Sequence, residues 1–335
     1  MIPQSHANVI YADWQQELSQ AIKDPVELLS LLGLEDRLEA IDGTILKQFP
    51  LRVTQSYLNK MRFADAVDPL LRQVFPLIDE GFQADGFSAD PVGDHLAVTT
   101  PGVLQKYQGR ALLLTTGACA IHCRYCFRRH FPYGDSNPLA RQWQDTLAEL
   151  RADHSINEVI LSGGDPLALS DAKLASLISD LQQIPQLKRL RIHTRLPVVL
   201  AKRITPALIE LLSDTRFQVV MVIHANHANE IDEEAAEVLA LLRAAGCELL
   251  NQTVLLKGVN DSADTLIALS ERLSDVKVIP YYLHLLDKVQ GASHFAVNDA
   301  LGIELIHQLR DALPGYLVPR LVREQQGEAS KTIIA

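Results

Sequence analysis

Three cysteines within eight residues are the most distinctive chemical feature of the sequence. Cys119, Cys123 and Cys126 are separated by three and then two residues. Three thiolates this close suit a polynuclear iron–sulfur cluster, because iron is well held by soft sulfur ligands. A structural zinc ion prefers four ligands and paired Cys-x-x-Cys units, although His122 could complete such a set. Cys247 stands apart in an apolar run, and we expect it to be a buried hydrophobic residue.

Other polar residues stand where short apolar runs end. In (β/α) barrels, site residues gather at the carboxyl ends of the parallel strands, so we expect these residues to meet at one site. They are Ser162-Gly163-Gly164-Asp165 after one run, His193 to Arg195 and His224 at the ends of two more, Asn251-Gln252 within a fourth, and Asp287 after the last.

The segments that must position these residues alternate between β-like and helical patterns from Arg110 onward. The β-like runs are nearly all apolar, as expected of parallel strands buried on both faces. They predict an α/β fold, a partial (β/α)6 TIM-like barrel, and the absence of a Gly-x-Gly-x-x-Gly fingerprint weakens a dinucleotide-binding interpretation. The expected strands are 111–116, 158–162, 189–194, 218–224, 248–256 and 276–284, and the expected helices are 172–183, 206–213, 233–245 and 265–273.

We predict three regions along the chain. Residues 1–97 read as a helical N-terminal extension, with one helix opening at Asp24-Pro25. Residues 98–290 form the barrel. Residues 291–335 form a C-terminal segment in which 317–323 is one more strand, followed by a polar loop that ends at Lys331-Thr332.

Composition narrows the class of protein. The 335 residues are 47% hydrophobic and 21% charged, which is a globular composition. With 31 basic and 41 acidic residues, the net charge of −10 argues against general binding to nucleic acid or to an anionic membrane. The sequence has no apolar stretch of about 20 residues and no basic region at its start, so we expect a cytoplasmic protein without membrane or direct nucleic-acid partners.

The cysteine spacing, together with Ser162-Gly-Gly-Asp-Pro166, resembles the radical S-adenosylmethionine superfamily. Further motifs resemble the lysine 2,3-aminomutase family within it, in recognisable order from about residue 65 to the end. These motifs are Thr194-Arg-Leu-Pro-Val-Val-Leu200, His224-Ala-Asn-His227, Asn251-Gln-Thr-Val-Leu-Leu-Lys-Gly-Val-Asn-Asp261 and Pro280-Tyr-Tyr282.

The resemblance implies three cofactors. The three cysteines would bind a [4Fe–4S] cluster and leave one iron open for a non-protein ligand. S-adenosyl-L-methionine would be bound by the Ser162–Asp165 turn, with His224 and Gln252. Pyridoxal 5′-phosphate would be held by Lys331, which stands in the family's Lys-Thr context. Its phosphate would be bound by Lys106, Tyr107 and Arg110, where Lys106 replaces a family Arg.

The resemblance also implies how a diamino acid is bound. Arg128 would grip the carboxylate of lysine, and Asp287 and Glu324 would hold its ε-ammonium group. Glu324 departs from the Asp of the family, and Gly327-Glu-Ala-Ser330 departs from the family's run of glycines. The implied reaction is the isomerisation of L-α-lysine to β-lysine. Two alternatives remain. One is a radical enzyme of related fold that acts on glutamate or arginine, and the other is a non-enzymatic iron–sulfur redox protein.

The short chain further resembles the bacterial branch that makes (R)-β-lysine for the modification of translation elongation factor P. That branch implies a functional link to an elongation factor P lysyl-ligase. Cluster reduction implies an electron donor such as a flavodoxin or a ferredoxin. Whether lysine is taken free or protein-bound stays open at this point.

Overall fold

A sheet of ten strands, neighbours in chain order, forms the centre of the computed structural model. The structure describes residues 14–40, 42–133 and 143–335. Strands β3 to β8 run parallel, as predicted for a barrel, and β1 and β10 lie at opposite edges, so the sheet remains open. The six parallel strands are β3 (Arg110–Thr116), β4 (Glu158–Gly163), β5 (Arg189–Thr194), β6 (Gln218–His224), β7 (Glu248–Val254) and β8 (Ile279–His284).

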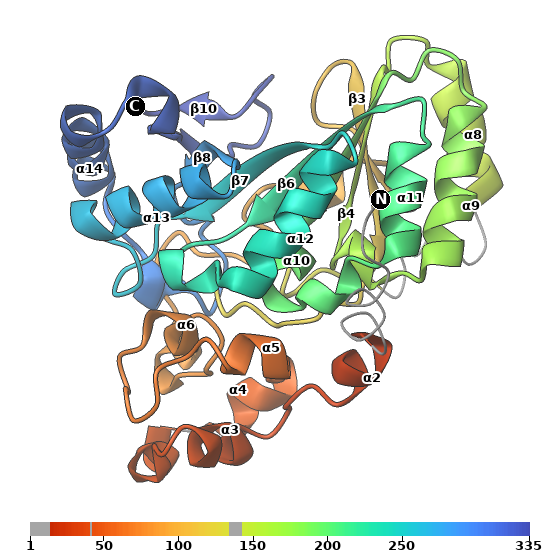
Figure 1. Cartoon of the computed structure of the whole chain (residues 1–335). Coiled ribbons are helices and arrows are strands. Elements are labelled where there is room, and N and C mark those ends of the chain that lie inside the picture. The colour runs from red at the N-terminus through yellow and green to blue at the C-terminus, as the bar shows by residue number, and fades with distance from the viewer. Residues whose placement is uncertain (1–13, 41, 134–142) are drawn as a thin grey trace.

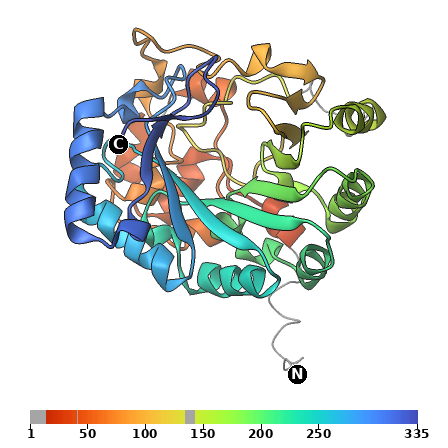
Figure 2. The ribbon, with the colours of Figure 1, turned by 90° about the horizontal axis from the view of Figure 1, so that it is seen from above.

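Helices cover the outer face of this sheet, which curves into an arc (Figure 2). They bury leucine-rich faces against the strands, such as Leu174, Leu177 and Leu181 of α9, and this interface forms the main core. The α/β partial barrel predicted from the sequence is therefore confirmed. The larger helices are α8 (Trp143–Ala152), α9 (Asp171–Gln182), α11 (Pro206–Ser213), α12 (Glu233–Ala244), α13 (Ala263–Asp275) and α14 (Asp299–Ala312).

Side-chain caps explain where these helices begin. Ser170, Thr205, Asp232 and Ser262 each accept a hydrogen bond from a backbone N–H of the first turn. All four predicted helices are present within two residues of the expected bounds. The short helical segments of the barrel are α10 (Leu196–Val199), η4 (Pro166–Ala168), η5 (Ala201–Arg203), η6 (Ala228–Glu230) and η7 (Ser293–Phe295).

Two predicted strands are shorter than expected. The run 276–284 begins as a strand only at Ile279, because Val276 still caps α13 and Lys277 takes a positive φ of 61°. The run 248–256 ends at Val254, because the backbone N–H of Leu256 turns to the side chain of Asn260.

The N-terminal extension lies against one end of the barrel, below the sheet in Figure 1. The helix predicted at Asp24-Pro25 is present, capped by the Asp24 side chain. Leu51, Val53 and Tyr57 join the same buried core as the barrel strands. The extension contains α2 (Trp14–Ser19), α3 (Pro25–Leu31), η1 (Glu35–Ala40), α4 (Gly43–Gln48), α5 (Gln55–Leu58), α6 (Pro69–Arg72), η2 (Ile78–Gly81) and η3 (Asp94–Leu96).

The opening residues, whose lack of a basic region contributed to the expectation of a cytoplasmic protein, lie outside the described residues. The predicted boundaries of the barrel region, between residues 97 and 98 and between residues 290 and 291, stay a prediction. Within the described part of the chain, no helix has the length and apolar character to cross a lipid bilayer.

Two short hairpins extend the sheet at its edges. Strands β1 (Val98–Thr100) and β2 (Val103–Leu104) pair antiparallel beside β3. At the other edge, β9 (Arg320–Arg323) runs parallel to β8, and β10 (Thr332–Ile333) folds back antiparallel on β9. The strand predicted at 317–323 starts later because Gly315–Leu317 forms the turn η8. The helices α8 and α14 and the strands β1, β2 and β10 were not predicted from the sequence.

Candidate active site

One cavity of about 450 Å³ lies at the carboxyl ends of the parallel strands, as expected for a barrel site. Every residue assigned from the sequence to a metal, a cofactor or the substrate lines it. These residues are Lys106, Tyr107, Arg110, Cys119, Cys123, Cys126, Arg128, Ser162, Gly163, Gly164, Asp165, His224, Gln252, Asp287, Glu324 and Lys331. Their roles remain predictions, but the fold brings all of them to one place.

The turn after β4 holds the loop that carries the cysteines. The backbone N–H of Gly164 donates to the carbonyl of Thr116 at 2.6 Å, and that of Asp165 donates to the carbonyl of Ala118 at 2.8 Å. A Cβ atom on Gly164 would lie 2.4 Å from the carbonyl oxygen of Ala118, closer than real Cβ contacts allow. Glycine is therefore required for the β4 turn and the cysteine loop to approach this closely.

The Asp165 side chain is turned into the protein. Its carboxylate accepts hydrogen bonds from Thr194 Oγ1 at 2.8 Å and from the backbone N–H of Arg195 at 2.7 Å. Burial raises the pKa of Asp165 to about 6 despite these bonds. The carboxylate thus joins the ends of β4 and β5, and its predicted contact with S-adenosylmethionine stays a prediction.

In the described part of the chain, the cysteine loop is not arranged around a single metal ion. Among the residues that the structure describes, no three His, Cys, Asp or Glu side chains are grouped closely enough to hold one ion. The Nδ1 atom of His122 is engaged with the carbonyl of Pro50 at 2.8 Å, and its ring stacks on Phe49. These contacts involve Nδ1 and the ring face, so they do not decide between a zinc ion and a cluster. Cys247 is buried, as expected, and does not line the cavity.

Burial also affects the thiols themselves. It raises the pKa of Cys119 well above its usual value and that of Cys126 to about 11. Because metal ligation requires thiolates, cluster binding at these residues must release protons.

Arg128 and Lys106 share an aspartate that sequence reasoning missed. Arg128 Nε donates to Asp94 Oδ2 at 2.6 Å, and Lys106 Nζ lies 2.7 Å from Asp94 Oδ1. Arg128 also donates to Ser162 Oγ at 3.1 Å. Burial opposes ionisation of Asp94, but the two cations outweigh burial and its pKa is lowered. The sequence showed Asp94 only as the end of a Pro- and Asp-rich turn, with no sign of its cationic partners.

A second charged group surrounds Glu324. Lys331 Nζ lies 2.5 Å from Glu324 Oε2, and the Tyr107 hydroxyl donates to Oε1 at 2.6 Å. Lys106 Nζ lies 3.6 Å from the same carboxylate. Arg110 lies over the Tyr107 ring, 5.2 Å from its centroid. The residues predicted to bind a phosphate are thus next to Lys331, and Glu324 contacts several of them.

Two histidines of the cavity were not assigned roles from the sequence. The Nε2 atoms of His193 and His284, at the ends of β5 and β8, are buried and have no hydrogen-bond partner among the described residues. Burial lowers the pKa of both imidazoles well below the usual value, so they are neutral near pH 7. His224 is neutral for the same reason, with a pKa of about 3, and its Nε2 lies 3.2 Å from the Tyr125 hydroxyl.

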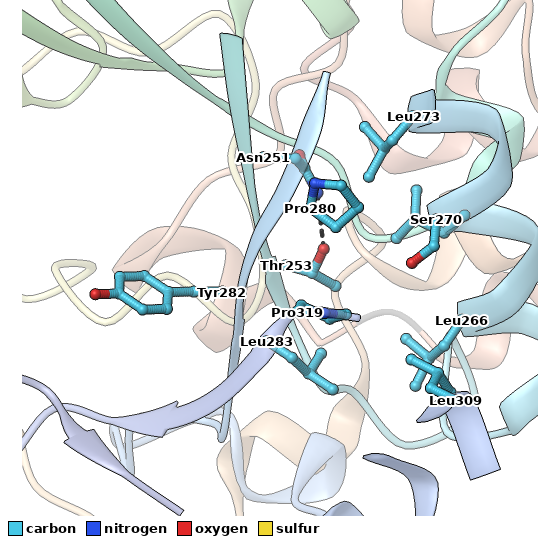
Figure 3. A pocket seen from close by; sticks show the side chains of 11 residues that line it. Asn251, Thr253, Leu266, Ser270, Leu273, Pro280, Tyr282, Leu283, Leu309 and Pro319 are labelled. Atoms are coloured by element: carbon cyan, nitrogen blue, oxygen red, sulfur yellow. Dashed lines mark hydrogen bonds between the residues drawn. The ribbon is translucent and has the colours of Figure 1, made fainter. Parts of the chain in front are cut away.

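Asn226 and Asn251 do not line the main cavity, although both stand near strand ends. Asn226 Nδ2 donates to the Tyr125 hydroxyl at 2.7 Å within a buried network. Asn251 lies on the side of β7 that faces α13 and donates to Thr253, while Tyr282 points the other way (Figure 3). The space beside Asn251 is about 10 Å³, at the lower limit for one water molecule, so it is a packing gap between sheet and helix.

Comparison with known proteins gives similarity over nearly the whole chain. Residues 113–269 match the Radical SAM superfamily. The L-lysine 2,3-aminomutases of Escherichia coli (strain K12) and Haemophilus influenzae are both 48% identical to this chain. The first alignment covers 96% of this chain and 94% of the relative, and the second covers 96% of each. The L-lysine 2,3-aminomutase of Clostridium subterminale is 35% identical over 96% of this chain and 77% of that protein. The likeness therefore extends well beyond residues 113–269.

Proposed function

Because the chain belongs to the lysine 2,3-aminomutase family of radical S-adenosylmethionine enzymes, we propose that it converts L-α-lysine into (R)-β-lysine. Membership of the family makes it an isomerase that uses a [4Fe–4S] cluster and S-adenosylmethionine. The observation that carries the proposal is the single cavity. Its lining includes the three cysteines, the partly exposed Lys331, the buried Arg128 and the acids Asp287 and Glu324, which together meet the needs of a diamino acid.

In this proposal Cys119, Cys123 and Cys126 bind the cluster. S-adenosylmethionine would be held by the β4 turn, Ser162–Asp165, together with His224 and Gln252. The cysteine loop suits an iron–sulfur cluster because it offers soft sulfur ligands. At Gly164 the β4 turn contacts this loop through backbone atoms, so no side chain lies between them.

We further propose that Lys331 holds pyridoxal phosphate and that Lys106, Tyr107 and Arg110 bind its phosphate. The site fits this group, because cationic and hydroxyl donors lie beside Lys331, and the Nε2 atoms of His193 and His284 find no hydrogen-bond partner in the part of the chain that the structure describes. When bound, the cluster with S-adenosylmethionine supplies the radical that takes hydrogen from the substrate, and the pyridoxal ring supplies the route for the amino group. The chain's own residues orient the substrate and exclude water.

Charge complementarity favours a cationic substrate such as lysine over glutamate. Arg128 would bind the carboxylate, and Asp287 with Glu324 would bind the distal ammonium. Glutamate would bring a second carboxylate to these two acids and would be repelled. An iron–sulfur redox protein without enzyme activity would have no use for Lys331 near such a pocket, and membership of an isomerase family also argues against it.

The test is an anaerobic incubation of the reconstituted protein with S-adenosylmethionine, a reductant and one amino acid. Lysine, glutamate and arginine are compared in parallel by mass spectrometry and chiral analysis. We expect (R)-β-lysine from lysine and no product from glutamate. A protein with full cluster and pyridoxal content that leaves lysine unchanged, or that turns over glutamate or arginine faster, would contradict the proposal.

We place this β-lysine in the modification of translation elongation factor P, in the cytoplasm, where the aminomutase acts upstream of a lysyl-ligase that uses its product. Support comes from the higher identity with the E. coli and H. influenzae relatives than with the longer Clostridium relative. A flavodoxin or ferredoxin would supply electrons. Incubating the enzyme's product with elongation factor P and its ligase, and measuring the mass of the factor, tests this role. An unchanged mass of elongation factor P would contradict this role.

A further inference from the structure

We propose that Arg195 raises the reduction potential of the cluster by donating a hydrogen bond to the Sγ atom of Cys123. Arg195 Nη1 lies 2.7 Å from this sulfur. The proposal rests on the cluster that family membership implies, and it is independent of lysine and pyridoxal phosphate. Arg195 acts through Cys123, so it is a positioning residue rather than a catalytic one.

The fold gives Arg195 little freedom to leave this position. It follows directly after β5, and its backbone N–H donates to the Asp165 carboxylate. Its side chain is 7% exposed. The second terminal nitrogen, Nη2, donates to Glu230 and to Gln73, each at 2.7 Å, and to the Tyr57 hydroxyl at 3.2 Å. One end of the guanidinium is thus anchored while Nη1 points at the sulfur.

Glu230 is itself fixed by other donors. Its Oε1 atom accepts from Gln73 Nε2 at 3.0 Å and from the backbone N–H groups of Asn226 at 2.8 Å and His227 at 3.1 Å. Burial opposes ionisation of Glu230, but Arg195 and these donors keep its pKa below the usual value. Glu230 is therefore an anion that partly offsets the charge of Arg195 next to the cluster site.

The direction of the effect follows from electrostatics. Reduction adds one electron, taken from an external one-electron donor, to the cluster and transfers no proton. The added negative charge is stabilised by a donor hydrogen bond and a nearby cation, and hydrogen bonds to the sulfurs are known to set cluster potentials. Arg195 should favour the reduced form, whereas the Glu230 carboxylate should oppose it.

The experiment is a redox titration of the reconstituted full-length protein, followed by electron paramagnetic resonance. S-adenosylmethionine and lysine are left out, so failure here is distinct from failure of the proposed reaction. For Arg195→Met we expect about tenfold less reduced cluster than wild type at the wild-type midpoint. This corresponds to a midpoint about 59 mV lower for one electron. For Glu230→Gln we expect a shift in the opposite direction.

Arg203→Met is the matched control. Arg203 is also fully buried, with an Asp171 partner and bonds to backbone carbonyls, but it does not line the cavity. Its loss should lower stability in a similar way and leave the potential unchanged. If Arg195→Met fails to load iron, Arg195→Lys replaces it. A lysine keeps the charge but cannot bridge Cys123 and Glu230, so a smaller shift in the same direction is expected.

The midpoint potentials of the four variants distinguish a specific effect of Arg195 from general damage to the fold. A lower midpoint for Arg195→Met or Arg195→Lys, a higher one for Glu230→Gln and no shift for Arg203→Met would support the proposal. An unchanged midpoint in the loaded Arg195 variant would overturn it. So would shifts of the same sign in the Arg195 and Glu230 variants, or an equal shift in Arg203→Met, because these patterns indicate general damage to the fold.

Discussion

At the scale of single residues, Asp287 is the group whose ionisation should govern substrate binding. Burial raises the pKa of its carboxyl to about 7, even though Lys331 nearby acts in the opposite direction. If Asp287 binds the ε-ammonium group of lysine, only its ionised form attracts that cation. Below the pKa the carboxyl is protonated and neutral. We therefore expect kcat/KM for lysine to fall as the pH is lowered through about 7, and to level off above it.

Asp287→Asn separates this carboxyl from other titrating groups. Removing the charge should lower kcat/KM for lysine by about 100-fold or more, since losing one partner of a buried ion pair costs about 3–5 kcal/mol. The acid limb of the pH profile should disappear with it. Iron and pyridoxal contents serve as controls and should match wild type. A variant with wild-type activity, or one that keeps the acid limb, would place the ammonium site elsewhere.

At the scale of secondary structure, the β9–β10 hairpin explains how a residue near the chain end reaches the barrel mouth. The register pairs Thr332 with Arg323, so Lys331 and Glu324 stand opposite each other. Glu324 and Lys331 are seven positions apart in the sequence because the residues between them form the loop of the hairpin. Lys331 is held over the cavity although few residues follow it.

Lys331→Ala should abolish pyridoxal binding and lysine turnover while leaving the cluster in place. The expected loss of turnover is at least about 1,000-fold, because the amine that holds the cofactor is removed. Lys288→Ala, an exposed lysine beside Asp287, is the matched control and should stay active. Borohydride reduction and peptide mapping of wild type should place the pyridoxyl label on Lys331. A label on Lys257 or Lys288 would refute the assignment.

The β4 turn gives a second prediction at this scale. In Gly164→Ala, the new methyl group would overlap the carbonyl of Ala118 and push the cysteine loop away. We expect a stability loss of about 1–3 kcal/mol and a lower iron-to-protein ratio. Gly43→Ala is the control, because nothing lies within 4 Å of its Cβ position, and it should bind iron normally. Normal iron loading in Gly164→Ala would mean that the close contact is not needed for the cluster.

At the scale of the whole molecule, the sequence predicted local and periodic features better than long-range partners. The cysteine motif is recognisable because its three cysteines lie within eight residues, and the strands are recognisable because their apolar runs are continuous. Asp94 and Glu230 were missed because their partners, Arg128 and Arg195, are 34 and 35 residues away. No spacing rule links such pairs, and only the folded chain brings them together.

The N-terminal extension was predicted as helical, but its contribution to the site was not. It supplies Tyr57 and Gln73 to the network around Arg195, and Glu80 to the cysteine loop. Single-sequence patterns could not show this, because the short helices α4, α5 and α6 carry weak periodic signals and are held by tertiary contacts. The cluster site is therefore built jointly by the extension and the barrel.

A substitution of Glu80 tests whether the extension supports the cysteine loop. Its carboxylate lies 2.6 Å from Arg124 Nη2 and from Arg129 Nη2, and the Glu80 and Arg124 side chains are fully buried. Glu80→Gln would leave two buried cations beside Cys123 without their counter-ion, at a cost of about 3–5 kcal/mol. We expect Tm to fall by roughly 6–15 °C, with reduced iron loading. Asp299→Asn, which breaks an exposed pair with Arg323, is the control and should cost about 1 kcal/mol or less. Equal Tm and iron content in the two variants would show that the extension does not support the cluster loop through Glu80.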